Sequence, residues 1–211
     1  MPEMLTVNSL YQLHNSLINS SSNLASLALR FYLAPIFWMA GMSKLNSFES
    51  TVAWFGNSDW GLGLPFPFLM ASLATAAELI GAVLLTLGLL TRLISIPLII
   101  TMLVAILSVH WDNGWQAIAD ANANAPFANA QVLAAPEKLE RARDILQAHG
   151  NYEWLTASGK FVILNNGIEF AATYLIMLLA LVGLGGGKYH SLDYWLSLYS
   201  TRKCLPLKNI L

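Results

Sequence analysis

Four long apolar stretches constrain this chain more than any other feature. They lie at residues 24–42, 66–90, 92–110 and 161–184, and each is close to the ~20 residues that an α-helix needs to cross ~30 Å of hydrocarbon. The chain is 56% hydrophobic and only 11% charged, whereas soluble domains carry about 25% charged residues. The sequence therefore predicts an integral membrane protein and excludes a soluble domain.

The apolar stretches also predict the fold class, because in lipid every backbone amide must find a partner within the protein. We expect an all-α fold: a single domain over residues 1–211 built as a membrane four-helix bundle, with a long, partly helical outer loop at residues 111–160. Within the loop, "PEKLERARDILQAHG" predicts a helix that starts at Pro136 and stops at Gly150. The preceding "DANANAPFANAQ" has no helical period and predicts irregular structure.

Charge and end segments add smaller constraints. With four spans both termini share one side, and because long loops translocate with little regard to charge, we place the termini in the cytoplasm and the 111–160 loop outside. The N-terminal segment is either an interfacial helix with Leu10, Leu13 and Leu17 on one face or a frayed tail. The net charge of −1 gives no indication of a nucleic-acid partner, and the single cysteine, Cys204, excludes an internal disulfide.

Three charged residues fall inside the spans, Arg30, Glu78 and Glu169, and Lys44 stands at the end of the first. At 1.5 Å per residue, Glu78 and Glu169 come out nearly level, at about 21 Å and roughly 18 Å from the inner boundary. Helical side chains lean toward their own N-terminus. We therefore expect Lys44 to lean toward the two glutamates and Arg30 to lean away from them.

The spacing of the polar residues predicts one cluster in the outer half of the bundle. Asn165 and Asn166 lie four and three residues before Glu169, a spacing that puts each of them near Glu169 on one face of a helix. The candidate functional cluster is Lys44, Glu78, Asn165, Asn166 and Glu169, with Arg30 as a more distant base. One interpretation is that these groups only hold the helices together; the other is that they handle a proton, a quinone or a cation, because charged residues inside a span are functional candidates.

A metal site is a further hypothesis. His110, Met39 and Met42 could add nitrogen and thioether ligands to the carboxylates, a mixture compatible with copper. The alternative is that the methionines only fill space between helices. No His-x-x-His or similar fixed spacing supports the metal interpretation.

Three segments resemble the DoxX family of small four-helix bacterial membrane proteins. They are "LRFYLAPIFWMAGMSKL", "ELIGAVLLTLGLLTR" and "GGGKYHSLDYWL", in this order along the chain. The chain has a longer outer loop than typical family members. Through this loop and the segments "WMAGMSKLNSFE", "HWDNGWQAIAD" and "LNNGIEFAATY" it is similar to an HvfX-like subgroup associated with maturation of copper-binding, ribosomally made modified peptides. The resemblance implies the bacterial inner membrane and membership of membrane redox systems, such as a thiosulfate:quinone oxidoreductase or an oxidative-stress complex.

These observations lead to three functional hypotheses. In the first, the chain is an accessory subunit of a redox or copper-peptide maturation system; its cluster handles a proton, a quinone or a cation such as copper, and its loop engages a protein partner on the outer side. In the second, it is a non-catalytic membrane scaffold that recruits partners through the Trp-rich loop. The third is a transporter for a small ion or peptide. The absence of a redox cysteine pair or a haem or flavin motif argues against an autonomous oxidoreductase.

Overall fold

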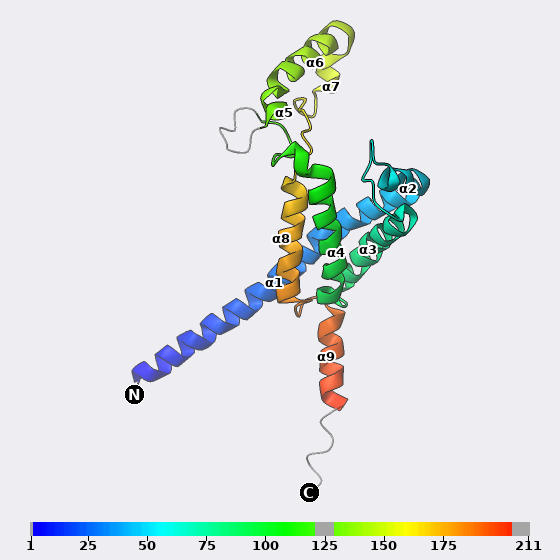
Figure 1. Cartoon of the computed structure of the whole chain (residues 1–211). Coiled ribbons are helices and arrows are strands. Elements are labelled where there is room, and N and C mark those ends of the chain that lie inside the picture. Colours follow the sequence, from blue (N-terminus) through cyan, green and yellow to red (C-terminus); the bar gives the residue numbers. More distant parts are fainter. Residues whose placement is uncertain (1, 121–128, 204–211) are drawn as a thin grey trace. The chain divides into compact units, whose positions relative to one another are not determined.

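The structure is a computed structural model that describes residues 2–120 and 129–203, and its regular elements there are helices (Figure 1). In chain order they are α1 (Pro2–Asn46), α2 (Phe48–Gly56), α3 (Pro67–Leu87), α4 (Thr91–Val104), a π-helix (Ala105–His110), a 3-10 turn (Trp111–Asn113), α5 (Ala130–Leu133), α6 (Ala135–His149), α7 (Tyr152–Leu155), α8 (Glu169–Leu184) and α9 (Leu192–Lys203). The extended backbone in this part of the chain forms a single isolated bridge, between Ile118 and Leu164.

Three helical segments are long and apolar enough to cross a membrane: Ser9–Asn46, Pro67–Leu87 and Thr91–Asn113. The fourth apolar helix, α8, is shorter, with 16 residues. Large apolar side chains such as Ile80 and Ile176 are exposed on these helices, 55% and 64% respectively, as expected of surfaces that face lipid. The prediction of an all-α membrane protein is confirmed.

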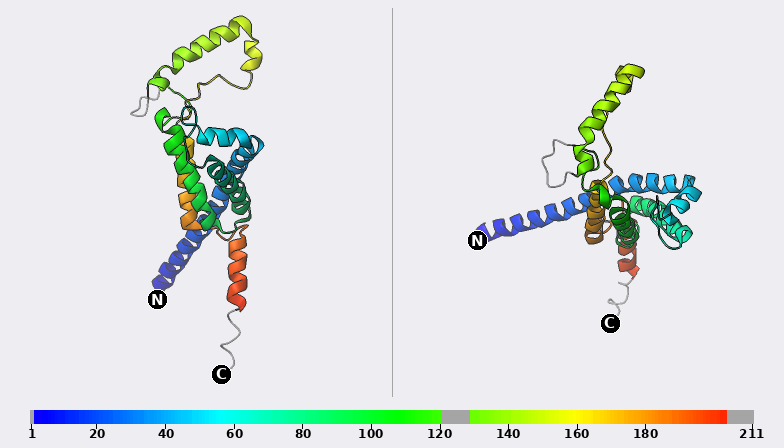
Figure 2. Two further views of the ribbon diagram at one scale, coloured as in Figure 1. Left: turned by 45° about the vertical axis from the view of Figure 1, so that its right-hand side comes forward. Right: turned by 45° about the horizontal axis from the view of Figure 1, so that its top comes forward.

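The chain divides into two compact units, Met1–Thr101 with Ile176–Leu211, and Met102–Leu175. In the first, α3 lies along the C-terminal half of α1 (Figures 1 and 2). Gly41 allows this close approach, because a Cβ added there would lie 2.7 Å from Cγ of Leu79. The buried residues of α3 include the small Ala71, Gly81 and Ala82, and a Cβ at Gly81 would lie 2.9 Å from Leu98 of α4, so small side chains allow close packing on α3.

The helix predicted within the 111–160 loop is confirmed. The loop helix α6 contains Pro136 in its first turn and ends at His149, one residue before Gly150. The N-terminal segment belongs to α1, which continues without a break from Pro2. Cys204 and residues 121–128 of the "DANANAPFANAQ" segment lie outside the described residues.

The prediction that a helix begins near Phe161 is wrong, since α8 begins at Glu169. The residues before it are extended because their backbone pairs with residues 117–119: Ala119 N donates to Ile163 O at 2.9 Å and Asn165 N to Ala117 O at 3.0 Å. Asn166 then takes a positive φ of 59°. Asn165 and Asn166 therefore precede the helix, and the depth assigned to Glu169 rested on a helix start that the structure does not have.

Candidate functional site

Lys44 and Glu78 form an ion pair between α1 and α3. Lys44 Nζ donates to both carboxylate oxygens of Glu78, at 2.9 and 2.8 Å. The Glu78 side chain is 4% exposed and the Lys44 side chain 27%, so the carboxylate is enclosed while the ammonium keeps a path to the surface. This ion pair is the one salt bridge among residues 2–120 and 129–203. It confirms the expected pairing of Lys44 with Glu78.

The backbone around the pair explains why it forms. Arg30, Ala34, Phe37 and Gly41 are buried along α1, on the stripe that leads to Lys44. Gly41 sits directly against Glu78, because its missing Cβ would lie 3.2 Å from Glu78 Cβ. The absence of a side chain at Gly41 thus lets the lysine of the next turn fold over the carboxylate.

Arg30 occupies a separate site in the same unit. Its side chain is fully buried; Nη1 donates to the carbonyls of Leu85 and His190, both at 3.0 Å, and Nη2 to the carbonyl of Tyr189 at 2.7 Å. One of these carbonyls, that of Leu85, belongs to the last turn of α3, where it also accepts from the N–H of Gly88 at 3.2 Å. Arg30 therefore binds backbone carbonyls rather than carboxylates, in line with the expectation that it leans away from Glu78.

Asp193 completes this Arg30 hub, which we define as Arg30, Asp193, Ser191 and the α3–α4 turn. The Asp193 carboxylate accepts from the backbone N–H groups of Leu90, at 2.7 Å, and Thr91, at 3.1 Å. Ser191 Oγ donates to Gly88 O at 3.1 Å. Sequence analysis did not connect Ser191 and Asp193 to this turn, because no local pattern relates them to residues about a hundred positions earlier.

Glu169 lies in the second unit, where it holds extended backbone against the start of α8. Its Oε2 accepts from Ala117 N at 2.9 Å, and its own N–H donates to Trp115 O at 3.0 Å. A carboxylate at a helix N-terminus also interacts favourably with the helix dipole. Glu169, which the sequence places within an apolar stretch, thus binds the backbone of residues 114–119.

Asn165 and Asn166 belong to the same region of paired backbone. We call this region the neck and define it as residues 110–119 and 164–169. Asn165 is 5% exposed and its Nδ2 donates to Asn113 O and Gln116 O, both at 2.7 Å. Its Oδ1 is buried without a partner in the described structure. A Cβ at Gly167 would lie 2.4 Å from Gln116 O, so only glycine fits where the two backbones meet.

A cavity of about 190 Å³ opens beside the neck. Its wall includes His110 at the end of the π-helix, Asn166, and the stacked rings of Phe170 and Tyr174, whose centroids are 6.4 Å apart. Segments of π-helix often occur at functional sites. The volume is below the ~300–1,000 Å³ of pockets for drug-sized ligands, so the cavity suits a single ring or a small head group. Sequence analysis missed both aromatic residues, which read as ordinary apolar helix.

The tautomer of His110 follows from its hydrogen bond. Nδ1 lies 2.8 Å from Asn166 O, and because a carbonyl only accepts, Nδ1 carries the proton. In neutral imidazole Nε2 is then an acceptor. Histidine ligands and bases are commonly held this way, by a carbonyl on the opposite ring nitrogen.

The copper hypothesis requires ligands from both units of the chain. Within residues 2–120 and 129–203, no three His, Cys, Asp or Glu side chains lie close enough to share a metal ion. Met39 is 64% exposed on α1. Met39 and Met42 belong to the first unit and His110 to the second, so a site that joins them remains a prediction, as does a cluster that joins Glu78 to Glu169.

Comparison with known proteins locates the part of the chain that has relatives. The family model described as DoxX matches residues 25–111. A protein of Bacillus subtilis (strain 168) named "Putative oxidoreductase CatD" is 37% identical over 92 residues, 44% of this chain and 64% of that relative. An "Uncharacterized protein" of Haemophilus influenzae is 35% identical over 98 residues, 44% of this chain and 62% of the relative.

The chain therefore spans less than two thirds of the length of either relative. No solved structure matches. The DoxX match contains the Lys44–Glu78 pair, Arg30 and His110, whereas the neck residues from Leu164 onward and Asp193 lie beyond it. Because the DoxX family model matches residues 25–111 and the B. subtilis protein is similar over 92 residues, the chain carries a DoxX family domain over residues 25–111.

Proposed function

We propose that the protein is an accessory subunit of a redox system in the bacterial inner membrane, with both termini in the cytoplasm. The observation that carries the proposal is the enclosed Lys44–Glu78 pair. The pair lies within the DoxX domain, the same domain that a relative named as a putative oxidoreductase shares with this chain. Charged groups inside a membrane protein are costly and are functional candidates by default.

The chemistry of the pair suits proton handling. Both oxygens of Glu78 are held by one ammonium group, so a proton added to the carboxylate or removed from the lysine changes the net charge of the enclosed site. In a medium of low dielectric constant such a change alters interactions with nearby charge strongly. A redox partner that takes up electrons and protons together could draw on this group, and the partly exposed lysine gives it a route to the surface.

The His110 cavity supports a quinone as the second component. A quinone ring presents carbonyl oxygens and flat apolar faces. The stacked Phe170 and Tyr174 rings offer an apolar wall of the right kind. The imidazole can donate to a quinone oxygen through Nε2 once it is protonated, because Nδ1 is already held by Asn166 O.

We predict that the purified protein binds a short-chain quinone with one-to-one stoichiometry, and that His110→Asn weakens this binding. An asparagine amide can replace Nδ1 in the bond to Asn166 O but offers nothing in place of Nε2. Loss of one hydrogen bond lowers affinity about ten-fold. Isothermal titration in detergent measures the effect, with His149→Asn on α6 as a matched control. Equal binding by wild type and His110→Asn would remove the cavity from the proposal.

Maturation of copper-binding peptides is a narrower version of the same function. It is supported by the resemblance of the long loop and by the potential ligand His110 beside a cavity. Neighbouring genes that encode a copper-binding peptide precursor would favour it, whereas genes for thiosulfate oxidation would favour the quinone version. Copper titration of the purified protein, compared with the quinone titration, shows which of the two ligands the protein binds.

A membrane scaffold is the second candidate, and the loop favours it. Leu133, Ile145 and Trp154 are 62%, 62% and 72% exposed, although they lie outside the apolar spans. Exposed apolar residues grouped on a segment often mark a protein interface. In this version the loop recruits an outer partner, and the Lys44–Glu78 pair only stabilises helix packing. A small-ion or peptide transporter is a third candidate that no particular contact favours.

Deletion of residues 120–150 distinguishes the loop from the membrane core. We expect the shortened protein to insert and fold, because α1, α3 and their ion pair lie outside the deletion, and to lose its outer partner. Crosslinking in native membranes followed by mass spectrometry measures the loss. The comparison variant carries Leu133→Ser, Ile145→Ser and Trp154→Ser in the full-length chain. If both variants retain the same crosslinked proteins as wild type, the loop is not a recruitment surface.

A further inference from the structure

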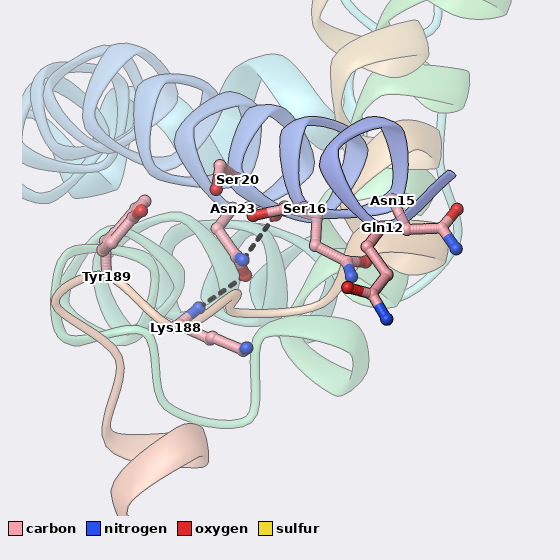
Figure 3. Close-up of a pocket in the computed structure, with 8 residues that line it drawn as sticks. Gln12, Asn15, Ser16, Ser20, Asn23, Lys188 and Tyr189 are labelled. Atoms are coloured by element: carbon pink, nitrogen blue, oxygen red, sulfur yellow. Dashed lines mark hydrogen bonds between the residues drawn. The ribbon is translucent and has the colours of Figure 1, made fainter. Parts of the chain in front are cut away.

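A polar groove of about 410 Å³ lies between the N-terminal part of α1 and the loop that follows α8 (Figure 3). On α1 it is lined by Gln12, Asn15, Asn19, Asn23 and the serines between them, and on the loop by Lys188 and Tyr189. All of these residues belong to the first unit. The backbone N–H of Lys188 donates to Oδ1 of Asn23 at 2.9 Å, which ties the two walls together.

The composition of the α1 wall is unusual for a helix surface. Asparagine and serine are weaker helix formers than the lysine, glutamate and glutamine common on such surfaces, so helix stability does not account for a stripe of them. The stripe contains no charged side chain. Within the described chain the side chains of Gln12, Asn15 and Asn19 make no hydrogen bond, so their amide donors and acceptors are available to a ligand.

Lys188 supplies the only charge on the groove wall. The lining includes no carboxylate, and the ion pair of the described residues is elsewhere, between Lys44 and Glu78. The ammonium of Lys188 is thus exposed and without an acidic partner in the described structure. One cation among neutral amides and hydroxyls favours a small anion whose oxygens can accept hydrogen bonds from several donors at once.

The groove lies where the apolar sequence gives way to polar sequence. On α1 the apolar run starts at Leu24, directly after Asn23, and on the loop Lys188 and the 46% exposed Tyr189 follow the end of α8. Tyrosine and lysine are typical of the membrane–water interface. Leu24 and Phe31, 60% and 47% exposed, continue along α1 from the groove and offer an apolar surface to acyl chains.

We propose that this groove binds the phosphate of an anionic phospholipid head group. The Lys188 ammonium pairs with the phosphodiester, and the amides of Asn15 and Asn19 donate to its remaining oxygens and to the head-group hydroxyls. Basic pockets at the ends of membrane helices are known to hold lipid head groups in this manner. The inference does not depend on the redox role, because neither the Lys44–Glu78 pair nor the His110 cavity contributes to the groove.

The test measures binding of a fluorescent short-chain phosphatidylglycerol to the full-length protein in neutral detergent. We expect saturable binding that Lys188→Gln weakens about five-fold, the contribution of one basic side chain near a membrane surface. Asn15→Ala with Asn19→Ala should weaken it as well, while alanine favours the helix and so keeps α1 folded. Lys138→Gln on α6 is the matched control and should bind as wild type does.

Competition separates a lipid from a soluble anion. Unlabelled phosphatidylglycerol should displace the probe, and inorganic phosphate at the same concentration should not. If inorganic phosphate displaces the probe equally well, the ligand is a soluble phosphate and the lipid assignment is wrong. If Lys188→Gln and the double asparagine variant both bind as wild type does, the groove is not a head-group site.

Discussion

Replacing either member of the Lys44–Glu78 pair alone should destabilise the protein, and replacing both should not. Lys44→Met leaves an enclosed carboxylate without its only cation, and Glu78→Gln leaves the ammonium facing a neutral amide. Breaking an enclosed ion pair by removing one partner costs about 3 kcal/mol or more, whereas removing both charges is often neutral. We expect the double variant Lys44→Met, Glu78→Gln to recover most of the stability that either single variant loses.

Activity then separates a functional pair from a structural one. Unfolding of the purified variants in detergent gives the stability, and quinone reduction by membranes from a strain that lacks the gene, supplemented with each variant, gives the activity. The proposed function requires the double variant to be stable and inactive. A double variant that is both stable and active would mean that the pair only holds α1 against α3, and the proton-handling role would have to be abandoned.

The ion pair was predictable because helical geometry is regular. A fixed rise per residue and a side-chain lean toward the N-terminus sufficed to pair Lys44 with Glu78 rather than Arg30 with Glu78. The lysine donates to both carboxylate oxygens, while Arg30 turns to the carbonyls of Leu85, Tyr189 and His190. The argument needed only positions along two neighbouring helices.

The start of α8 was not predictable by the same reasoning. Hydropathy detects apolar residues, and residues 161–168 are apolar enough to extend the run, but their backbone pairs with residues 114–119 instead of with itself. This pairing depends on the positive φ of Asn166 and on the close backbone approach at Gly167. The motif "NNG" was visible in the sequence and contains the residue types that tolerate such conformations, so it was the available signal for an irregular segment.

The Arg30 hub was missed for a different reason. Its contacts join residues that are 55 to 160 positions apart, and they use backbone carbonyls, which leave no pattern in the sequence. No signal in the sequence indicated the role of the glycines near it. Gly88 has a second function, because a Cβ there would lie 2.6 Å from Nη1 of Arg30, so the residue that ends α3 also makes room for the guanidinium.

Arg30→Met should cost more stability than any other single arginine replacement in the described chain. It leaves the carbonyls of Tyr189 and His190 without their donor, while the Leu85 carbonyl keeps the N–H of Gly88 at 3.2 Å. Each carbonyl left unpaired in a buried setting costs about 1–3 kcal/mol, so the expected loss in the free energy of unfolding is about 2 kcal/mol or more. Arg30→Lys keeps the charge but lacks the planar fork that reaches several carbonyls at once, so it should recover only part of this loss.

Arg92 is the matched control, because it lies beside the same hub and donates one hydrogen bond, from Nη2 to Gly183 O at 3.0 Å, at an exposed position. Arg92→Met should cost less than about 1 kcal/mol, since water replaces the lost donor. Thermal unfolding in detergent measures both variants. Equal losses for Arg30→Met and Arg92→Met would show that the Tyr189 and His190 carbonyls find other donors. A large loss confined to Arg30 would mean that this one side chain couples α1, the end of α3 and the loop before α9.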